Sequence, residues 1–107
     1  MPDARPLTEA QEGLWYAQAL DPANPILNTG QYLDLRGPVD PDALRQALTR
    51  TLAETEALRL RFRQGADGPE QWLDPAPVTP AVLRATEAEA HAAMRADSGR
   101  PLDLARD

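Results

Sequence analysis

The sequence predicts an α+β fold in which helices flank a mixed sheet. Three observations favour it: helix-start patterns recur along the chain, one run alternates strictly between apolar and basic residues, and a glycine-containing turn follows that run. With 107 residues, the chain suits one domain or part of one. The order of the signals predicts helix, strand, helix, hairpin, an ambiguous segment and a final helix, without selecting a topology.

The first helix is predicted from its start signal. Thr8 can accept a backbone N–H, and Gln11 three residues later completes a capping-box pattern. Apolar residues at helical spacing extend the helix over Glu9–Leu20, and the Asp21-Pro22 pair ends it. An imperfect alternation between Asn28 and Arg36 then predicts a strand.

The second helix has the clearest start in the chain. Asp40 is the predicted N-cap and Pro41 occupies the first helical position, so the helix should run to about Glu56. The run Leu58–Arg63 follows with a strict period of two. It predicts a half-buried strand with three apolar side chains on one face and three guanidinium groups on the other.

A hairpin and a third helix are expected in the rest of the chain. Residues 65–68 have turn chemistry, and residues 71–73 can return as the partner strand. The Pro-rich stretch 74–80 separates this hairpin from residues 81–83, for which the pattern leaves helix and strand equally open. Thr86 and Glu89 form another capping box, opening a helix that reaches about Ala96.

Composition excludes several functional classes. The net charge of −6 and a pI near 4.7, with no block of basic residues, make nucleic acid a poor partner. Cysteine is absent, which removes disulfides, thiolate nucleophiles and zinc–thiolate sites. No apolar stretch approaches the roughly 18 residues of a membrane span, and the first six residues lack the apolar core of a leader. We therefore expect a cytoplasmic protein that makes no membrane contact.

No residue in the chain has the pattern of a catalytic, cofactor-binding or metal-binding group. His91, the single histidine, lies in an Ala-rich predicted helix without a nucleophile pattern, which favours a packing or solvent-facing role. Trp15 and Trp72 are interpreted as core residues rather than ligand platforms. Gly65 and Gly68 fit a hairpin turn and lack the spacing of a phosphate-binding loop.

Three stretches together resemble the condensation domains of nonribosomal peptide synthetases. Residues 8–17, TEAQEGLWYA, are similar to the opening family motif SxAQxR(L/M)(W/Y)xL, with Gly13 in place of the usual Arg. Residues 54–62, ETEALRLRF, are similar to RHExLRTxF but lack its leading Arg-His and its Thr. Residues 100–104, RPLDL, resemble the RPFDL segment that precedes the HHxxxDG motif. Their order and separation make the joint match more specific than any one of them.

This resemblance implies a fold, a chemistry and a set of partners. The fold is that of chloramphenicol acetyltransferase, two similar lobes around a tunnel, of which this chain would form part of one lobe. The family joins an acyl or peptidyl thioester to an aminoacyl amine, each held on the phosphopantetheine arm of a peptidyl or acyl carrier protein, beside other synthetase domains. The second histidine of HHxxxDG positions or deprotonates the amine. Residues 1–107 are thus expected to be an N-terminal fragment, inactive by itself because that motif is absent.

One site residue follows from the resemblance. The family arginine that matches Arg59 helps to hold the catalytic loop by pairing with its aspartate, so Arg59 is expected to support the active site. A solvated strand arginine is the competing interpretation. An initiator-like Met1 just before the first motif suggests a domain that begins a synthetase, as in siderophore assembly. Two alternatives stay open: a small non-catalytic interaction module, and a fragment of an epimerising, ester-forming or carrier-independent acyltransferase of the same superfamily.

Overall fold

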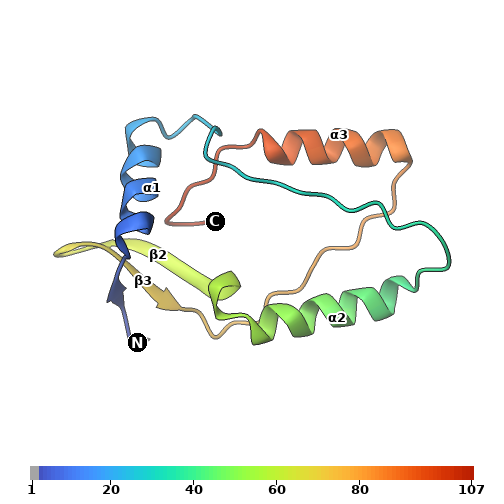
Figure 1. The fold of residues 1–107 in the computed structure, drawn as a ribbon, viewed down its shortest axis with the longest axis horizontal. Helices are drawn as coiled ribbons and strands as arrows, with labels where there is room; N and C mark the ends of the chain where they lie inside the picture. Colours follow the sequence, from blue (N-terminus) through green and yellow to red (C-terminus); the bar gives the residue numbers. More distant parts are fainter. Residues whose placement is uncertain (1–2) are drawn as a thin grey trace.

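The computed structural model describes residues 3–107, so Met1 and Pro2, including the initiator-like methionine, lie outside the described residues. Its seven elements are, in chain order, β1 (Arg5–Pro6), α1 (Glu9–Leu20), α2 (Pro41–Glu54), the 3₁₀ helix η1 (Glu56–Arg59), β2 (Leu60–Gly65), β3 (Gly68–Leu73) and α3 (Glu87–Ser98). A small antiparallel sheet and α1 lie at one end of the molecule, and α2 and α3 extend away from that end (Figure 1). The α+β class is confirmed.

The first helix begins and ends where the sequence predicts. The Thr8 hydroxyl accepts the Gln11 backbone N–H at 3.2 Å, and the Gln11 side chain accepts the Thr8 N–H at 2.9 Å. This is the full capping box, which satisfies two backbone donors at the start of the helix. Gln11 also exchanges side-chain hydrogen bonds of 3.1 and 2.9 Å with Gln71, so the same residue joins α1 to β3.

The other two long helices also start at their predicted caps. Asp40 Oδ1 accepts the backbone N–H groups of Asp42 and Ala43 at 3.0 and 3.3 Å, which fixes the first turn of α2. Thr86 Oγ1 accepts from the Glu89 backbone N–H at 3.2 Å, the hydroxyl half of the predicted capping box of α3. The C-terminal ends of α2 and α3 each differ by two residues from the prediction, because the end of a helix has a weaker local signal than its start.

The hairpin is confirmed, with one correction to its first strand. The predicted strand began at Leu58, whereas Leu58 and Arg59 belong to η1 and the strand runs Leu60–Gly65. The reason is a local turn: the Leu58 N–H donates back to the Thr55 carbonyl at 3.2 Å, which keeps Leu58 and Arg59 in the 3₁₀ helix, and the paired register starts at Leu60, opposite Leu73. The turn closes through Gly68, whose φ of 125° suits glycine, which has no Cβ.

The sheet has a third, very short strand that the sequence did not predict. β1 pairs antiparallel with β3, with Arg5 opposite Gln71 and Pro6 opposite Glu70, so the strand order is β1-β3-β2. Two residues are too few to show an alternating pattern, and proline cannot donate to a ladder. This strand is therefore recognised only in the folded structure, where β3 pairs with it.

The predicted strand between residues 28 and 36 is wrong for this chain. The segment is an extended connection beneath α3 in Figure 1, and within residues 3–107 it pairs with no strand. Tyr32, Leu33 and Leu35 are 61, 73 and 58% exposed. Alternation makes a strand only where a second strand offers its backbone groups, and none lies beside this segment. The ambiguous residues 81–83 likewise form neither helix nor strand.

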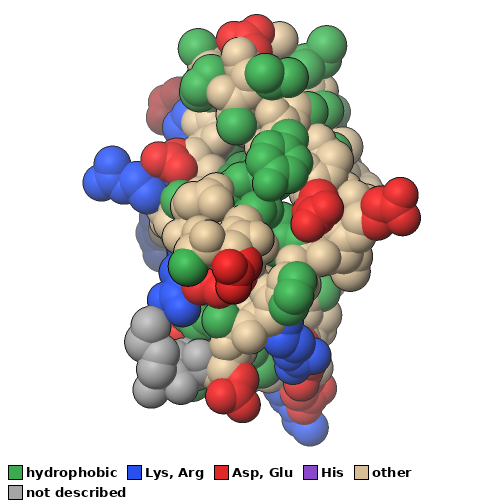
Figure 2. Space-filling view, turned by 90° about the vertical axis from the view of Figure 1, so that its left-hand side faces the viewer, with side chains coloured by type: hydrophobic (Ala, Val, Ile, Leu, Met, Phe, Trp, Pro, Cys, Tyr) green, Lys and Arg blue, Asp and Glu red, His purple; other side chains and the backbone are tan. Residues whose placement is uncertain are grey.

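The described residues bury little of their surface. Among them only Leu7, Gln18 and Pro69 are buried, with Leu7 and Gln18 each 8% exposed. The chain exposes 8752 Å², whereas a compact protein of its mass exposes about 5,900 Å². Its radius of gyration is 16.5 Å, against about 13 Å for a compact domain of this length. Figure 2 shows hydrophobic side chains at the surface, interspersed with acidic and basic ones, over the end formed by α1 and the hairpin.

No helix within residues 3–107 combines the length and the apolar character that crossing a membrane requires.

Candidate functional site

The side chain of Arg59 has a buried nitrogen that forms no hydrogen bond. Arg59 is the last residue of η1, and its backbone is fixed because its carbonyl accepts the Asp74 N–H at 3.0 Å. Its Nε is buried and, alone among the buried side-chain nitrogen and oxygen atoms of residues 3–107, has no hydrogen-bond partner. A buried donor without an acceptor is costly, by about 1–3 kcal/mol and more for charged groups. A hydrogen-bond acceptor from another part of the protein that reached this Nε would therefore remove that cost.

The surroundings of Arg59 form a small depression beside the hairpin. A cavity of about 200 Å³ is lined by the end of η1, the start of β2, the segment after β3 and the last residue of the chain. Its lining residues are Leu58, Arg59, Leu60, Arg61, Asp74, Ala76, Val78 and Asp107. Two carboxylates and two guanidinium groups therefore meet in one pocket with apolar walls.

Asp74 is the ordered carboxylate of this pocket. Its Oδ1 accepts the Ala76 backbone N–H at 2.9 Å, and its Oδ2 accepts from Arg61 Nε at 3.2 Å. The Ala76 N–H lowers the pKa of Asp74; the hydrogen bond and charge of Arg61 add to this, against an opposing contribution from burial. The charge of Arg59 also lowers this pKa, although the two side chains form no hydrogen bond.

The other two arginines of this run already have partners. Arg61 is paired with Asp74, and its Nη1 donates to the Arg106 carbonyl at 3.5 Å. Arg63 donates to Glu70 at 2.6 Å, and its guanidinium lies 5.0 Å from the centre of the Trp72 ring. Glu70 is directly opposite Arg63 on β3, and Trp72 is diagonal to it. Arg59 is thus the arginine of the three whose Nε lacks a partner.

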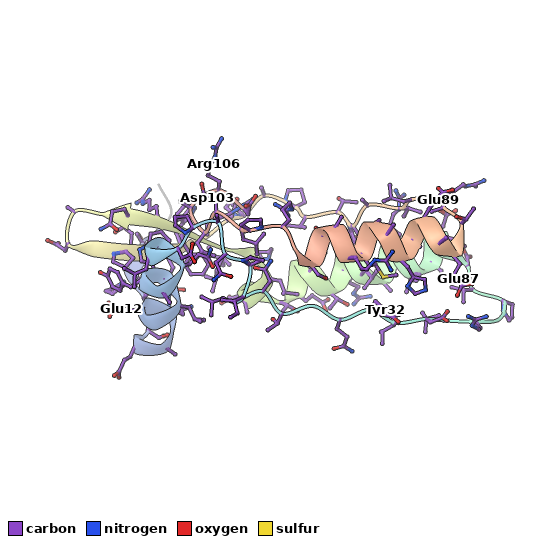
Figure 3. The ribbon with its side chains drawn as sticks, turned by 90° about the horizontal axis from the view of Figure 1, so that it is seen from above. Glu12, Tyr32, Glu87, Glu89, Asp103 and Arg106 are labelled. Carbon is purple, nitrogen blue, oxygen red and sulfur yellow. The ribbon has the colours of Figure 1, made fainter. Side chains whose placement is uncertain are left out.

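His91 lies in α3, where it contacts the extended segment. Its ring packs edge-on against Tyr32, with centroids 5.8 Å apart, and its Nε2 lies 3.8 Å from Glu87 Oε1. The side chain is 41% exposed. Figure 3 shows Tyr32 and Glu87 on these two neighbouring segments. The histidine therefore has packing contacts, and it is not among the lining residues of the Arg59 pocket.

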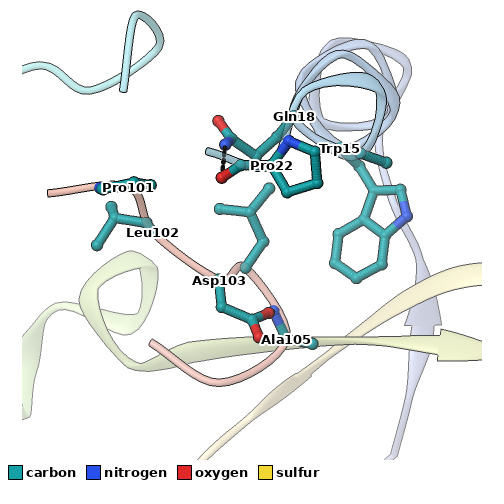
Figure 4. A pocket seen from close by; sticks show the side chains of 9 residues that line it. Trp15, Gln18, Pro22, Pro101, Leu102, Asp103 and Ala105 are labelled. Carbon is teal, nitrogen blue, oxygen red and sulfur yellow. Dashed lines mark hydrogen bonds between the residues drawn. The ribbon is translucent and has the colours of Figure 1, made fainter. Parts of the chain in front are cut away.

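The tryptophans have different surroundings. Trp72 is engaged with Arg63, while Trp15 lines a 340 Å³ cavity between α1 and residues 101–105 (Figure 4). Both are half-buried rather than core residues. No group of three or more His, Asp or Glu side chains within residues 3–107 is arranged to hold a metal ion.

Two amide side chains that sequence reasoning missed hold loops together. Gln18, 8% exposed, donates to the carbonyls of Pro22 and Asn24 at 3.2 Å each and shapes the turn after α1. Asn28 donates to the carbonyls of Ser98 and Arg100 at 3.2 and 2.8 Å. Neither residue belongs to a periodic pattern or a cap, and the Asn28 partners are about 70 positions away, so no local signal in the sequence marks them.

Comparison with known proteins gives a consistent set of matches. The Condensation domain family model matches residues 1–107. A dimodular nonribosomal peptide synthase of Bacillus subtilis is 40% identical over 97% of this chain and 5% of its own length. An isonitrile lipopeptide synthase of Streptomyces coeruleorubidus is 41% identical over 99% of this chain and 8% of its own length. The chain thus spans less than a tenth of either relative.

Solved structures agree with these sequence matches. The starter condensation domain of rhizomide synthetase superimposes with a TM-score of 0.80 at 32% identity, over 97% of this chain and 27% of that one. The first condensation domain of the calcium-dependent antibiotic synthetase, in complex with a substrate analogue, gives 0.77 at 37% identity, again over 97% and 27%. The chain therefore spans about a quarter of these structures.

Proposed function

The chain belongs to the condensation domain family, and from this premise we propose that it forms part of a domain that makes amide bonds for a nonribosomal peptide synthetase. The bond joins a carrier-bound acyl or peptidyl thioester to the amine of a carrier-bound aminoacyl group. The amine nitrogen attacks the thioester carbon, the C–N bond forms, the C–S bond breaks, and the donor arm leaves as a thiol after the amine has lost a proton.

The part contributed by this chain is support rather than proton transfer. Its single histidine packs against Tyr32, away from the Arg59 pocket, and the HHxxxDG pattern does not occur in the sequence. The imidazole that acts on the amine is supplied by that motif, which follows the RPLDL-like segment in the family. Residues 1–107 alone are therefore expected to be inactive.

The observation that carries the proposal is the unpartnered Arg59 Nε. A buried guanidinium donor without an acceptor suits the carboxylate of the catalytic loop, and Arg59 is also the position that matches the family arginine. The pair would be charge-assisted and would fix the loop, as such contacts do. The competing interpretation, a solvated strand arginine, is less compatible with a buried Nε at the end of a 3₁₀ helix.

The partners follow from the same chemistry. Peptidyl or acyl carrier proteins bring the substrates on phosphopantetheine arms, other synthetase domains load those carriers, and the setting is the cytoplasm. A variant of the rhizomide starter domain has been solved with C8-CoA, which supports an acyl group as one donor to test.

The experiment uses the complete condensation domain that contains this chain, with separately loaded donor and acceptor carrier proteins. Donors should include a C8 acyl group and aminoacyl groups, and products are read by intact-protein mass spectrometry. Amide product on the acceptor carrier supports the proposal. An epimerised or ester product would assign another activity of the superfamily, and no product with any donor would contradict amide formation.

The role of Arg59 has its own test. Replacing Arg59 with Ala in the complete domain should lower the rate of amide formation about 10-fold to 100-fold, because the catalytic loop loses a fixed partner. Arg84→Ala removes the same charge at an exposed position and should leave the rate unchanged. Equal rates in the two variants, with both domains folded, would remove Arg59 from the site.

A further inference from the structure

The last residues of the chain, 98–107, form a segment that we call the terminal strap. The strap begins at the end of α3 and reaches the hairpin, and the C-terminus lies between α1, α3 and the sheet in Figure 1. It contains the RPLDL stretch, after which the family places a strand and then its catalytic motif. Whatever fixes the strap therefore also bears on where that motif starts.

The side chain of Asn28 joins the beginning of the strap to the loop after α1. Its Nδ2 donates to both the Ser98 and the Arg100 carbonyls, at 3.2 and 2.8 Å. Its own backbone is fixed, because its N–H donates to the Pro25 carbonyl at 2.9 Å. Ser98 ends α3, where carbonyl groups lack an intrahelical donor, so the amide satisfies a group that the helix leaves open.

The contact between these two segments is close. A Cβ on Gly30, two residues after Asn28, would lie 3.3 Å from the Ser98 hydroxyl oxygen. The loop that contains Asn28 and the end of α3 therefore lie in direct contact.

The middle of the strap is packed loosely. Leu102 and Leu104 are half-buried beside α1, and cavities of about 340 and 280 Å³ adjoin them. Figure 4 shows Trp15 and Gln18 of α1 on one side of the larger of these cavities and Leu102 and Asp103 of the strap on another. Packing against α1 is therefore incomplete on this side, and the hydrogen bonds at the two ends of the strap contribute to its placement.

The far end of the strap has the weaker tether. Arg61 Nη1 donates to the Arg106 carbonyl at 3.5 Å, the limit of a hydrogen bond. The bonds from Asp103 and Asp107 join residues within the strap itself. Gly99 and Arg100 also bond to α3 itself, through the Arg95 and Asp97 carbonyls at 3.1 and 3.2 Å. Of the side-chain hydrogen bonds to segments distant in sequence, the two from the Asn28 amide are shorter than the one from Arg61.

We propose that Asn28 is a positioning residue: by fixing the start of the terminal strap, it sets the position of the imidazole contributed by the motif that follows. This inference rests on the proposed function. A reacting group displaced by about 1 Å can lose about 100-fold in rate, so a loose strap should slow the reaction without weakening substrate binding.

The test compares Asn28→Asp with Asn24→Asp in the complete condensation domain. The first variant keeps the size of the side chain but replaces the donor with a carboxylate, which cannot donate to carbonyls. Asn24 lies in the same loop, and its side-chain bonds go to nearby Asp21 and Ile26, so it is a control matched in charge and chemistry. Asn28→Ala and Asn24→Ala form a second, uncharged pair, in case the carboxylate prevents folding.

Both Asn28 variants should lower kcat for amide formation about 10-fold to 100-fold relative to their controls, with KM for both carrier-bound substrates unchanged. Amide hydrogen exchange of residues 100–106 should be faster in the Asn28 variants than in the Asn24 variants. Equal kcat values for folded Asn28 and Asn24 variants would overturn the positioning role, and so would a fall in kcat that merely follows a fall in Tm.

The experiment also distinguishes failure of the proposed function from failure of the role proposed for Asn28. If the wild-type domain makes no amide, the proposed function fails, and the exchange measurement alone then decides whether Asn28 holds the strap. Unchanged exchange over residues 100–106 would show that it does not, whatever reaction the domain catalyses.

Discussion

At the scale of single residues, the surroundings of two glycines show how differently the same residue can be used. Gly13 replaces a family arginine in α1, and a Cβ there would meet no atom within 4 Å. At Gly65 a Cβ would lie 2.8 Å from the Glu70 carboxyl group and 2.9 Å from the Gly68 carbonyl. No packing contact requires a glycine at position 13, whereas Gly65 leaves room for the Glu70 carboxylate that binds Arg63.

Alanine substitutions at these two positions should therefore have opposite effects. Gly13→Ala should stabilise the complete domain by about 0.5–1 kcal/mol, because alanine suits a helix better than glycine. Gly65→Ala should destabilise it by about 1–3 kcal/mol, because Glu70 must move and its pair with Arg63 is disturbed. Denaturant unfolding monitored by circular dichroism measures both, and changes of the same sign would contradict the packing described for Gly65.

At the scale of elements, the paired hairpin differs from the unpaired segment 29–36. The hairpin is tied at its turn by glycines and at its open end by Arg61 and Asp74. The segment 29–36 has apolar side chains in a strand-like pattern but pairs with no strand among the described residues. An unpaired edge of this kind is a site for strand pairing, which a neighbouring part of a larger domain would satisfy.

The Arg61–Asp74 anchor should make the hairpin sensitive to acid. The pKa of Asp74 is lowered from its ordinary value of 3.8, so its contribution to stability is fully present above that value and is lost as pH falls through the lowered pKa. Asp74→Asn should reduce stability near neutral pH and flatten the acid side of the stability profile. Tm measured from about pH 2 to 7 tests this.

The matched control for this profile is Asp3→Asn. It removes the same charge from an exposed position in the described chain. Its acid profile should keep the shape of the wild type. If Asp74→Asn gave the same profile as Asp3→Asn, the anchor would have no role in acid stability.

At the scale of the whole molecule, the open shape is the dominant fact. The described residues extend over 51 × 29 × 19 Å, and α2 and α3 lie on opposite sides of the view in Figure 1. The excess of nearly 3,000 Å² over a compact protein, about a third of the exposed surface, is surface that a larger domain would cover. The matched condensation domains are about four times longer than this chain, consistent with such cover.

The isolated 107-residue chain should consequently be a poor folding unit. We expect a broad, non-cooperative thermal transition and binding of a hydrophobic dye before heating, because too little apolar surface is buried to offset chain entropy. The complete domain should unfold in a sharp transition with little dye binding. Calorimetry and dye fluorescence measure these properties, and a sharp transition for the isolated monomer would contradict the expectation.

Local chemistry determined the helix starts and the hairpin turn. Thr8, Asp40 and Thr86 cap helices through bonds to residues two or three positions away, so the sequence is sufficient to place them. Gly68 gives the turn its positive φ for the same local reason. The three short motifs also identified the family, because their order along the chain does not depend on the fold.

Tertiary structure decided everything that depends on a distant partner. The short strand β1, the loss of the strand at residues 28–36 and the start of β2 at Leu60 follow from which backbone groups found partners. The Asn28 contact with Ser98 spans 70 positions, and the buried Arg59 Nε is distinguished by the lack of a hydrogen-bond partner. Hydrogen bonds over such separations leave no periodic trace in a sequence, so only the folded chain reveals them.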